Sequence, residues 1–186
     1  MSESTNTPKI WYGCLQCYNE GHLRGEWFDA IEDRQAISEY VKAHQARYSS
    51  IYGIHEEWEI FDREHISEKL ASAILFANDD IHEEWVELLD NHDMGKVSAY
   101  LDWSNDDLNT FSPWEIGQRI TETHKGEYET LLAYAEENAE SHYPEYFELE
   151  RRYPNLPMHF DYRALVVELE ANSGYTVEGG HVWETA

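Results

Sequence analysis

Acidic residues alternate with apolar ones along the whole chain, and this arrangement limits what the chain can fold into. Every part holds more Asp and Glu than Lys and Arg: 12 against 6 over residues 1–66, 9 against 2 over 67–103, and 17 against 5 over 104–186. No block of five consecutive acids occurs, so the charge does not form an acidic tail. We therefore expect the acids at regular intervals on the surfaces of folded elements.

The total imbalance indicates the kind of partner. The formal net charge is −25 over 186 residues, and self-repulsion of this size destabilises a compact state. Nucleic acid is excluded as a direct ligand because its phosphates would repel the chain, and bilayers with anionic lipids are disfavoured for the same reason. Hydrophobic residues reach 41% and aromatic residues 14%, enough to build folded cores rather than a disordered chain. The composition predicts a folded protein that binds a basic surface.

The first part of the chain alternates strand and helix patterns. Residues 9–18 are apolar and aromatic and predict a strand, followed by a glycine-containing loop over 19–26. Apolar residues recur at helical spacing over 33–48, and residues 57–62 alternate apolar and acidic side chains as a half-buried strand does. These patterns predict a small α+β domain over 1–65.

The middle of the chain carries helix patterns without strand patterns. Ser67 is placed to cap a first helix, and Asp80 with Glu83 resembles the capping box of a second. A third short helix follows a turn at 91–93. We predict a helical domain over 66–103.

The remainder returns to mixed structure. Residues 116–124 fit helix or strand, 128–142 and 160–171 predict helices, and prolines at 144, 154 and 157 are expected to break the segment between them. A hairpin is predicted over 175–184 around a glycine pair. The third domain is therefore α+β over 104–186, and the fold class of the whole chain is α+β with three small domains.

Catalytic and metal motifs are weak. Cys14 and Cys17 form a CxxC pair with His22 nearby, but Trp27 stands where a fourth zinc ligand would fall and no second CxxC follows. The simpler interpretation is a strand with small apolar thiols. No GxSxG or other nucleophile context appears. We predict no catalytic residue, no metal and no cofactor, and hence a protein that is not an enzyme.

The charge is large enough to imitate duplex DNA. DNA carries one charge per about 1.7 Å of axis, so 25 charges along one elongated face would span roughly 42 Å, about a dozen base pairs. The acids expected to contact a basic partner in place of phosphates are Asp79, Asp80, Glu83, Glu84, Glu87, Asp90, Asp93, Asp106, Asp107, Glu136, Glu137 and Glu140.

Two ordered motifs resemble the ArdA antirestriction family. The stretch over 18–29, YNEGHLRGEWFD, is similar to that family's Y-N-x-G-x-x-x-G-x-W-x-D signature, and the EWEIFD strand follows where the family has a similar acidic string. FDYRAL at 160–165, followed by Glu168 and Leu169, is similar to the family's C-terminal F-D-Y motif, and Gly126-Glu127-Tyr128 also fits. Together these motifs span most of the chain.

The resemblance implies an elongated three-domain homodimer that mimics bent B-form DNA. It implies a DNA-mimic antirestriction protein, carried on mobile genetic elements, that blocks the DNA-binding groove of the specificity and methyltransferase core of type I restriction–modification enzymes. Leu131 and Leu132 are the nearest match to the family's apolar antirestriction motif, which is associated with the dimer interface.

Two other functions remain open from the residues alone. An acidic adaptor or metal-binding module for another basic partner would gather its charge in one pocket, and a hydrolase is a weaker third possibility. No apolar run is long enough to span a membrane, and Met1 to Pro8 lack the pattern of a signal peptide. We expect a cytoplasmic protein with reduced cysteines.

Overall fold

A computed structural model describes residues 7–53, 55–108 and 110–185 as a mixture of helices and small antiparallel sheets. The α+β class is therefore confirmed. Contacts divide the chain into two compact units, Met1–Trp114 and Glu115–Ala186. The division into three domains, with boundaries after residues 65 and 103, stays a prediction. None of the helices in the described ranges is long and apolar enough to cross a membrane.

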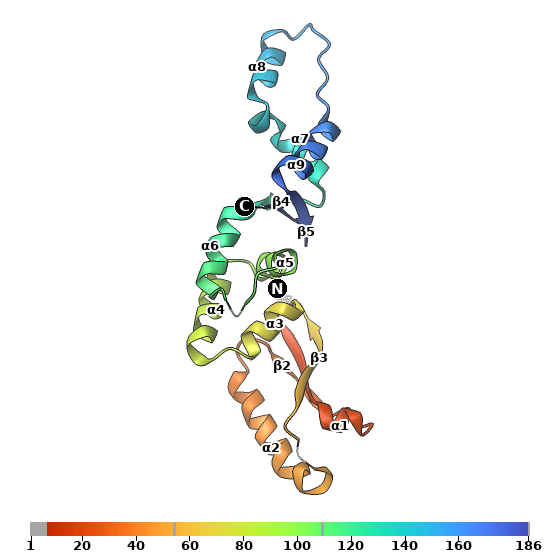
Figure 1. Cartoon of the computed structure of the whole chain (residues 1–186), viewed down its shortest axis with the longest axis vertical. Coiled ribbons are helices and arrows are strands. Elements are labelled where there is room, and N and C mark those ends of the chain that lie inside the picture. Colours follow the sequence, from red (N-terminus) through yellow and green to blue (C-terminus); the bar gives the residue numbers. More distant parts are fainter. Residues whose placement is uncertain (1–6, 54, 109, 186) are drawn as a thin grey trace, which may run out of the picture. The chain divides into compact units, whose positions relative to one another are not determined.

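Figure 1 labels most of the elements along the chain. In order they are β1 (Lys9–Cys14), α1 (Leu15–Asn19), β2 (Gly25–Asp29), α2 (Arg34–Tyr52), β3 (Trp58–Glu64), α3 (Glu68–Leu75), α4 (Asp79–Asn91), α5 (Met94–Trp103), α6 (Pro113–Thr123), β4 (His124–Glu127), α7 (Leu131–His142), α8 (Pro144–Arg152), α9 (Tyr162–Ser173), β5 (Tyr175–Glu178) and β6 (His181–Glu184).

The first unit contains a three-stranded antiparallel sheet with β1 at its centre, in the order β2-β1-β3. Helix α2 follows β2 in the chain and lies beside this sheet (Figure 1). The helix packs on the sheet through aromatic rings: the centroid of the Tyr40 ring lies 5.6 Å from that of Phe28 and 5.7 Å from that of Trp58. His44 on the same helix lies 5.0 Å from Trp58. The predicted helix over 33–48 and strand over 57–62 are confirmed, and the packing explains why both carry aromatic residues on one side.

The strand predicted over 9–18 is wrong in its second half. β1 ends at Cys14, and residues 15–19 form the short helix α1. The sulfur of Cys14 accepts a hydrogen bond from the backbone N–H of Cys17 and so acts as the helix cap. The apolar run does not distinguish strand from helix here, because both β1 and α1 bury apolar side chains. The predicted loop over 19–26 also ends early, since β2 begins at Gly25 and pairs with β1.

Helices α3, α4 and α5 confirm the helical pattern of residues 66–103. Ser67 caps α3 as predicted, with its side chain accepting from the N–H of Leu70. The capping box at Asp80 is wrong, because Asn78 is the N-cap of α4 and Asp80 lies inside the first turn. Asn78, Asp79 and Asp80 follow one another, and each of these residue types is a good N-cap, so the sequence alone does not determine which of them begins the helix.

The second unit contains a small antiparallel sheet in the order β4-β6-β5 with α7 and α9 beside it. Its core includes Leu131, Tyr134, Leu165, Leu169 and Val182. The hairpin over 175–184 is confirmed by β5 and β6, and both glycines in its turn have positive φ. This is the conformation that a two-residue hairpin turn requires.

The structure assigns the ambiguous residues 116–124 and corrects the prediction for Pro144. The ambiguous stretch 116–124 is helix α6 up to Thr123 and strand β4 from His124 onward. Pro144 was predicted to break the chain, yet it begins α8. Proline is suited to the first position of a helix because the N–H it lacks has no partner there.

Candidate functional site

Helix α4 carries six of the predicted partner-binding acids and no lysine or arginine. Trp85 and Leu88 are buried on its inner side, which fixes the helix against the first unit. Five of its six acids are exposed and Glu84 is partly buried. The apolar spacing that drives α4 to fold therefore places a row of carboxylates on its outer face.

The first turn of α4 is stabilised despite its charge. Asp79 and Asp80 lie at the helix N-terminus, where the helix dipole favours negative groups. Asp79 also lies 3.3 Å from the guanidinium of Arg34 at the start of α2. Farther along the helix, Glu83, Glu87 and Asp90 follow one another at spacings of four and three residues, so neighbouring like charges oppose helix formation. We infer that burial of Trp85 and Leu88 offsets this repulsion.

Three predicted acids between α4 and α6 have local structural roles. Asp93 caps α5 by accepting from the N–H of Lys96. Asp106 is partly buried and accepts a hydrogen bond of 2.5 Å from the hydroxyl of Tyr100. Asp107 is exposed and accepts from the hydroxyl of Thr110. Asp106 is therefore the least available of the three to a partner.

In the second unit, α7 repeats the pattern of α4. Its buried side includes Tyr134, Ala135 and Ala139, and its outer side exposes Glu136, Glu137 and Glu140. Glu140 forms an ion pair with Arg151 of α8. The amphipathic pattern predicted for this helix is confirmed, and the three glutamates share one exposed region. Leu131 and Leu132 are the nearest match to an apolar interface motif; Leu131 is buried in the core of this unit and Leu132 is partly buried.

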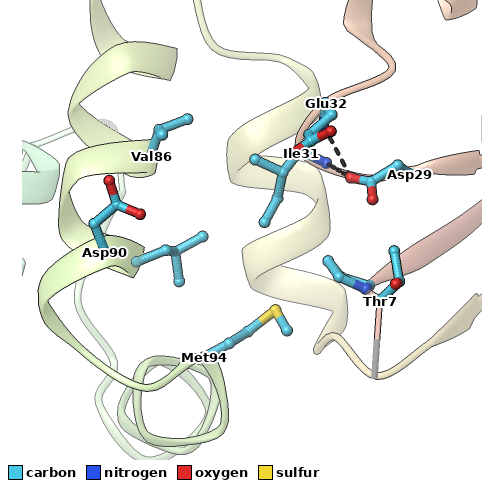
Figure 2. Close-up of a pocket in the computed structure, with 9 residues that line it drawn as sticks. Thr7, Asp29, Ile31, Glu32, Val86, Asp90 and Met94 are labelled. Atoms are coloured by element: carbon cyan, nitrogen blue, oxygen red, sulfur yellow. Dashed lines mark hydrogen bonds between the residues drawn. The ribbon is translucent and has the colours of Figure 1, made fainter. Parts of the chain in front are cut away.

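A shallow pocket of about 460 Å³ lies within the first unit, between α4 and the segment that follows β2. Figure 2 shows Val86, Asp90 and Met94 on one side of it and Ile31 and Glu32 on the other. Its lining residues among the described part of the chain include no cysteine, histidine or lysine. The pocket is thus a mixed apolar and acidic hollow that includes Asp90 of α4.

A second cluster lies in the interior of the same unit, and the sequence motifs did not identify all its members. Cys14 and Cys17 meet His44 of α2 and His55 of the loop before β3, and all four side chains are buried. Each of these side chains offers one potential ligand atom, a cysteine sulfur or a histidine ring nitrogen. These four atoms all lie within 4.8 Å of one another. His22, the histidine closest in sequence to the CxxC pair, is exposed.

The surroundings of this cluster favour neutral side chains. Burial lowers the pKa of His44, and the neighbouring His55 and Arg24 lower it further. Burial raises the pKa of the Cys17 thiol, as does the adjacent Cys14, while Arg24 acts in the opposite direction. A neutral imidazole keeps a free lone pair, which is the form that binds metal ions.

Comparison with known proteins identifies the family. The sequence model of the antirestriction protein family ArdA matches residues 10–183 of the 186. The chain belongs to the ArdA antirestriction family. A search of curated proteins finds no match. Membership confirms the resemblance of the sequence motifs, and it implies antirestriction activity against type I restriction–modification enzymes.

The N-terminal ArdA motif has a structural explanation. Gly21 has a φ of +83°, which L side chains rarely adopt, and Gly25 packs directly against Trp11 and the carbonyl of Tyr12. Asp29 accepts hydrogen bonds from the two backbone N–H groups at positions 31 and 32, as Figure 2 shows. These motif residues shape the turn around β2 rather than supply surface charge.

The C-terminal ArdA motif also stabilises the fold. Asp161 caps α9 by accepting from the N–H groups of Arg163 and Ala164. Phe160 lies between aromatic rings, 5.5 Å from Tyr143 and 5.0 Å from Tyr162. The motifs that identify the family therefore build its fold, and the acids of α4 and α7 are the separate candidates for partner contact.

Proposed function

We propose that this ArdA-family protein occupies the DNA-binding groove of the specificity and methyltransferase core of a type I restriction–modification enzyme, with its carboxylates in place of DNA phosphates. The observation that supports this most is the outer face of α4, which exposes five carboxylates and contains no lysine or arginine. A basic groove would gain electrostatic complementarity from such a face.

The charge spacing on α4 is close to that of a DNA strand. From Asp79 to Asp90 the helix advances about 17 Å at 1.5 Å per residue. The exposed acids Asp79, Asp80, Glu83, Glu87 and Asp90 divide that length into steps of about 4 Å on average, against about 3.4 Å per phosphate along one strand of duplex DNA. The α4 face therefore supports imitation of a short phosphate run, and the exposed acids of α7 supply a second one.

The second candidate function, an acidic adaptor for another basic partner, is less well supported. It requires charge gathered at one site, whereas exposed acids occur on helices of both units. The pocket beside α4 contains Asp29, Glu32 and Asp90 together with apolar side chains, and its described lining residues include no cysteine or histidine that could serve as nucleophile or base. An inhibitor without catalytic activity therefore fits these features better than an enzyme.

Assembly and location follow from the same proposal. We infer a homodimer, because it would double the length of charged surface presented to a groove, and the family resemblance implies one. We infer a cytoplasmic location because the target enzyme acts there on DNA. Light scattering coupled to size-exclusion chromatography tests the dimer: a mass near twice the 21.9 kDa of one chain supports it, and a monomer at working concentration contradicts it.

A competition experiment tests the mimicry. The purified methyltransferase core of a type I enzyme is bound to a labelled duplex containing its target site, and the protein is added while fluorescence anisotropy reports bound DNA. We expect displacement of the duplex that weakens steeply as salt rises. An unrelated basic DNA-binding protein serves as control. Undiminished DNA binding with micromolar protein contradicts the proposal, and equal displacement from the control protein indicates a general polyanion instead.

A further inference from the structure

We propose that Cys14, Cys17, His44 and His55 bind one zinc ion in a closed, structural Cys2His2 site inside the first unit. This site is independent of the antirestriction activity. Its residues come from the end of β1, from α1, from the middle of α2 and from the loop before β3. The fold therefore brings together ligands from four places in the chain.

The distances fit tetrahedral zinc. With Zn–S of about 2.3 Å and Zn–N of about 2.0–2.1 Å, sulfur and nitrogen ligands lie about 3.5 Å apart. The sulfur of Cys17 lies 3.4 Å from Nε2 of His44 and 3.5 Å from Nδ1 of His55. The sulfur of Cys14 lies 3.0 Å from the same Nδ1, and no pair of ligand atoms is farther apart than 4.8 Å. The four ligand atoms therefore surround a space of the size that one zinc ion needs.

The donor set selects zinc. Two thiolates and two imidazoles in tetrahedral arrangement are typical of structural zinc sites, whereas calcium and magnesium require oxygen ligands. Four protein ligands fill a tetrahedral site and leave no coordination position open for a substrate, and all four side chains are buried. The complex of Zn²⁺ with two thiolates and two neutral imidazoles carries no net charge, so its burial avoids the penalty of an isolated ion.

Neighbouring groups hold the ligands in place. The N–H of Cys17 donates to the sulfur of Cys14, and a guanidinium nitrogen of Arg24 lies 3.8 Å from the sulfur of Cys17. The loop that carries His55 is held by its carbonyl, which accepts from the side chains of Gln45 and Trp58. Such supporting contacts are a regular feature of metal sites.

The imidazole of His55 provides an independent indication of a ligand. Its Nδ1 lies 3.0 Å from the sulfur of Cys14 and 3.5 Å from the sulfur of Cys17, and the ring is fully buried. A buried polar ring with only weak sulfur contacts is unfavourable in a protein interior. Coordination of Nδ1 to a metal would give the ring a strong partner and a reason to be buried.

Zinc at this position would link α2 to the β2-β1-β3 sheet. The two cysteines belong to the β1–α1 segment, while His44 lies in the middle of α2 and His55 in the loop that follows this helix. A chain that carries a net charge of −25 gains from such a cross-link, because repulsion between its acids opposes folding. Metal binding would then contribute directly to the stability of the first unit.

The test uses the full-length protein, expressed with zinc in the medium and purified under reducing conditions. Metal content by plasma mass spectrometry should give one zinc per chain. Exchange with cobalt should produce the intense visible d–d absorption of a tetrahedral site together with thiolate-to-cobalt charge transfer in the near ultraviolet. Absence of both signals in the reduced protein overturns the proposal, as does recovery of Cys14 and Cys17 as a stable disulfide that takes up no cobalt.

Variants assign the ligands. Cys17→Ser and His44→Asn should each lose the tetrahedral cobalt spectrum and lower the affinity for zinc at least tenfold. His22→Asn, which changes an exposed histidine beside the CxxC pair, is the matched control and should keep full metal content. An unchanged cobalt spectrum in Cys17→Ser places the metal elsewhere and overturns the assignment.

If the ligand variants fail to fold, chelator titration of the wild-type protein decides: loss of one zinc with unfolding of the first unit supports the site, and zinc release without structural change contradicts it.

Discussion

Arg34, the first residue of α2, forms an ion pair with Asp79, the first residue of α4, across 3.3 Å. The same guanidinium donates to the backbone carbonyls of Ala77 and Asn78. One arginine therefore connects the start of the acidic helix to the sheet-bound helix α2. Asp79, although counted among the partner-binding acids, already has a cation nearby.

Substitution of Asp79 should affect the free energy of unfolding less than substitution of Arg34. The Asp79 side chain is 93% exposed, so Asp79→Asn should change the free energy of unfolding by about 0.5 kcal/mol or less. Arg34→Met also removes the bonds to two carbonyls, and we expect a loss of about 1–2 kcal/mol. Urea denaturation of both variants measures the difference, and equal effects would show that the carbonyl bonds contribute nothing.

Neutralising the outer face of α4 should weaken inhibition far more than any single change. An exposed carboxylate contributes about 0.2–1 kcal/mol. The quadruple variant Asp80→Asn, Glu83→Gln, Glu87→Gln, Asp90→Asn should therefore lose about tenfold or more in inhibition, and each single variant less than about fivefold. Titration of methyltransferase inhibition at two salt concentrations measures both the loss and a smaller salt dependence.

A charge-preserving variant is the control for this experiment. Exchanging Asp and Glu at the same four positions keeps the charge and should keep the inhibition, because mimicry depends on charge rather than on side-chain identity. The neutral variant should fold as well as the wild type, since it removes like-charge pairs along the helix. If one single substitution abolishes inhibition, a localised site replaces the extended charged face.

Local patterns in the sequence predicted most elements but not the contacts between distant ones. Ser67 caps α3 and the glycine pair turns the last hairpin because such signals act over a few residues. The change from β1 to α1 is not visible in the sequence pattern, because buried strands and buried helices have the same apolar composition. The helix begins where the sulfur of Cys14 accepts a hydrogen bond from the backbone. Hydrophobic periodicity does not resolve segments this short.

The Cys and His cluster shows the same limit more clearly. His55 lies 41 residues from Cys14, and the sequence offers no spacing rule for ligands brought together by a helix and a sheet. The positions at zinc-ligand spacing from the CxxC pair are His22 and Trp27, and both are exposed. The acids of α4 and α7 were found from sequence because exposure follows from the apolar periodicity of their own helices.

The glycines of the N-terminal motif should respond to substitution for different reasons. A Cβ at Gly25 would lie 2.6 Å from Nε1 of Trp11 and 2.7 Å from the carbonyl oxygen of Tyr12, so Gly25→Ala should cost about 1–3 kcal/mol through overpacking. Gly21 has open space but a φ of +83°, and Gly21→Ala should cost about 1–2 kcal/mol through backbone strain. Gly21→Asn should recover part of that loss, because Asn tolerates positive φ; no recovery would exclude backbone strain as the cause.

Asp161 should contribute to stability and not to partner binding. Its carboxylate accepts from two backbone N–H groups at the start of α9, and loss of such a cap costs about 1 kcal/mol. Asp161→Ala should lower the unfolding free energy by that amount, while Asp161→Ser should retain most of it. Inhibition measured well below the unfolding temperature should match the wild type in both variants. A loss of inhibition in folded Asp161→Ser would place this acid on the partner surface.

Alkaline pH should destabilise the second unit through two buried tyrosines. Burial raises the pKa of Tyr134 and of Tyr175 above the ordinary value of 10, and their rings lie 5.5 Å apart in the core. Both hydroxyls ionise more readily in the unfolded chain, so their contribution to stability is complete below pH 10 and is lost as the pH rises through the folded-state values.

Tyrosinate absorbance followed during an alkaline titration in moderate urea should therefore rise together with unfolding. The double variant Tyr134→Phe, Tyr175→Phe should move the unfolding midpoint to higher pH, and Tyr153→Phe, a change at an exposed ring, should leave it in place. An unmoved midpoint in the double variant would show that repulsion among the acids, rather than the buried phenols, sets the alkaline limit.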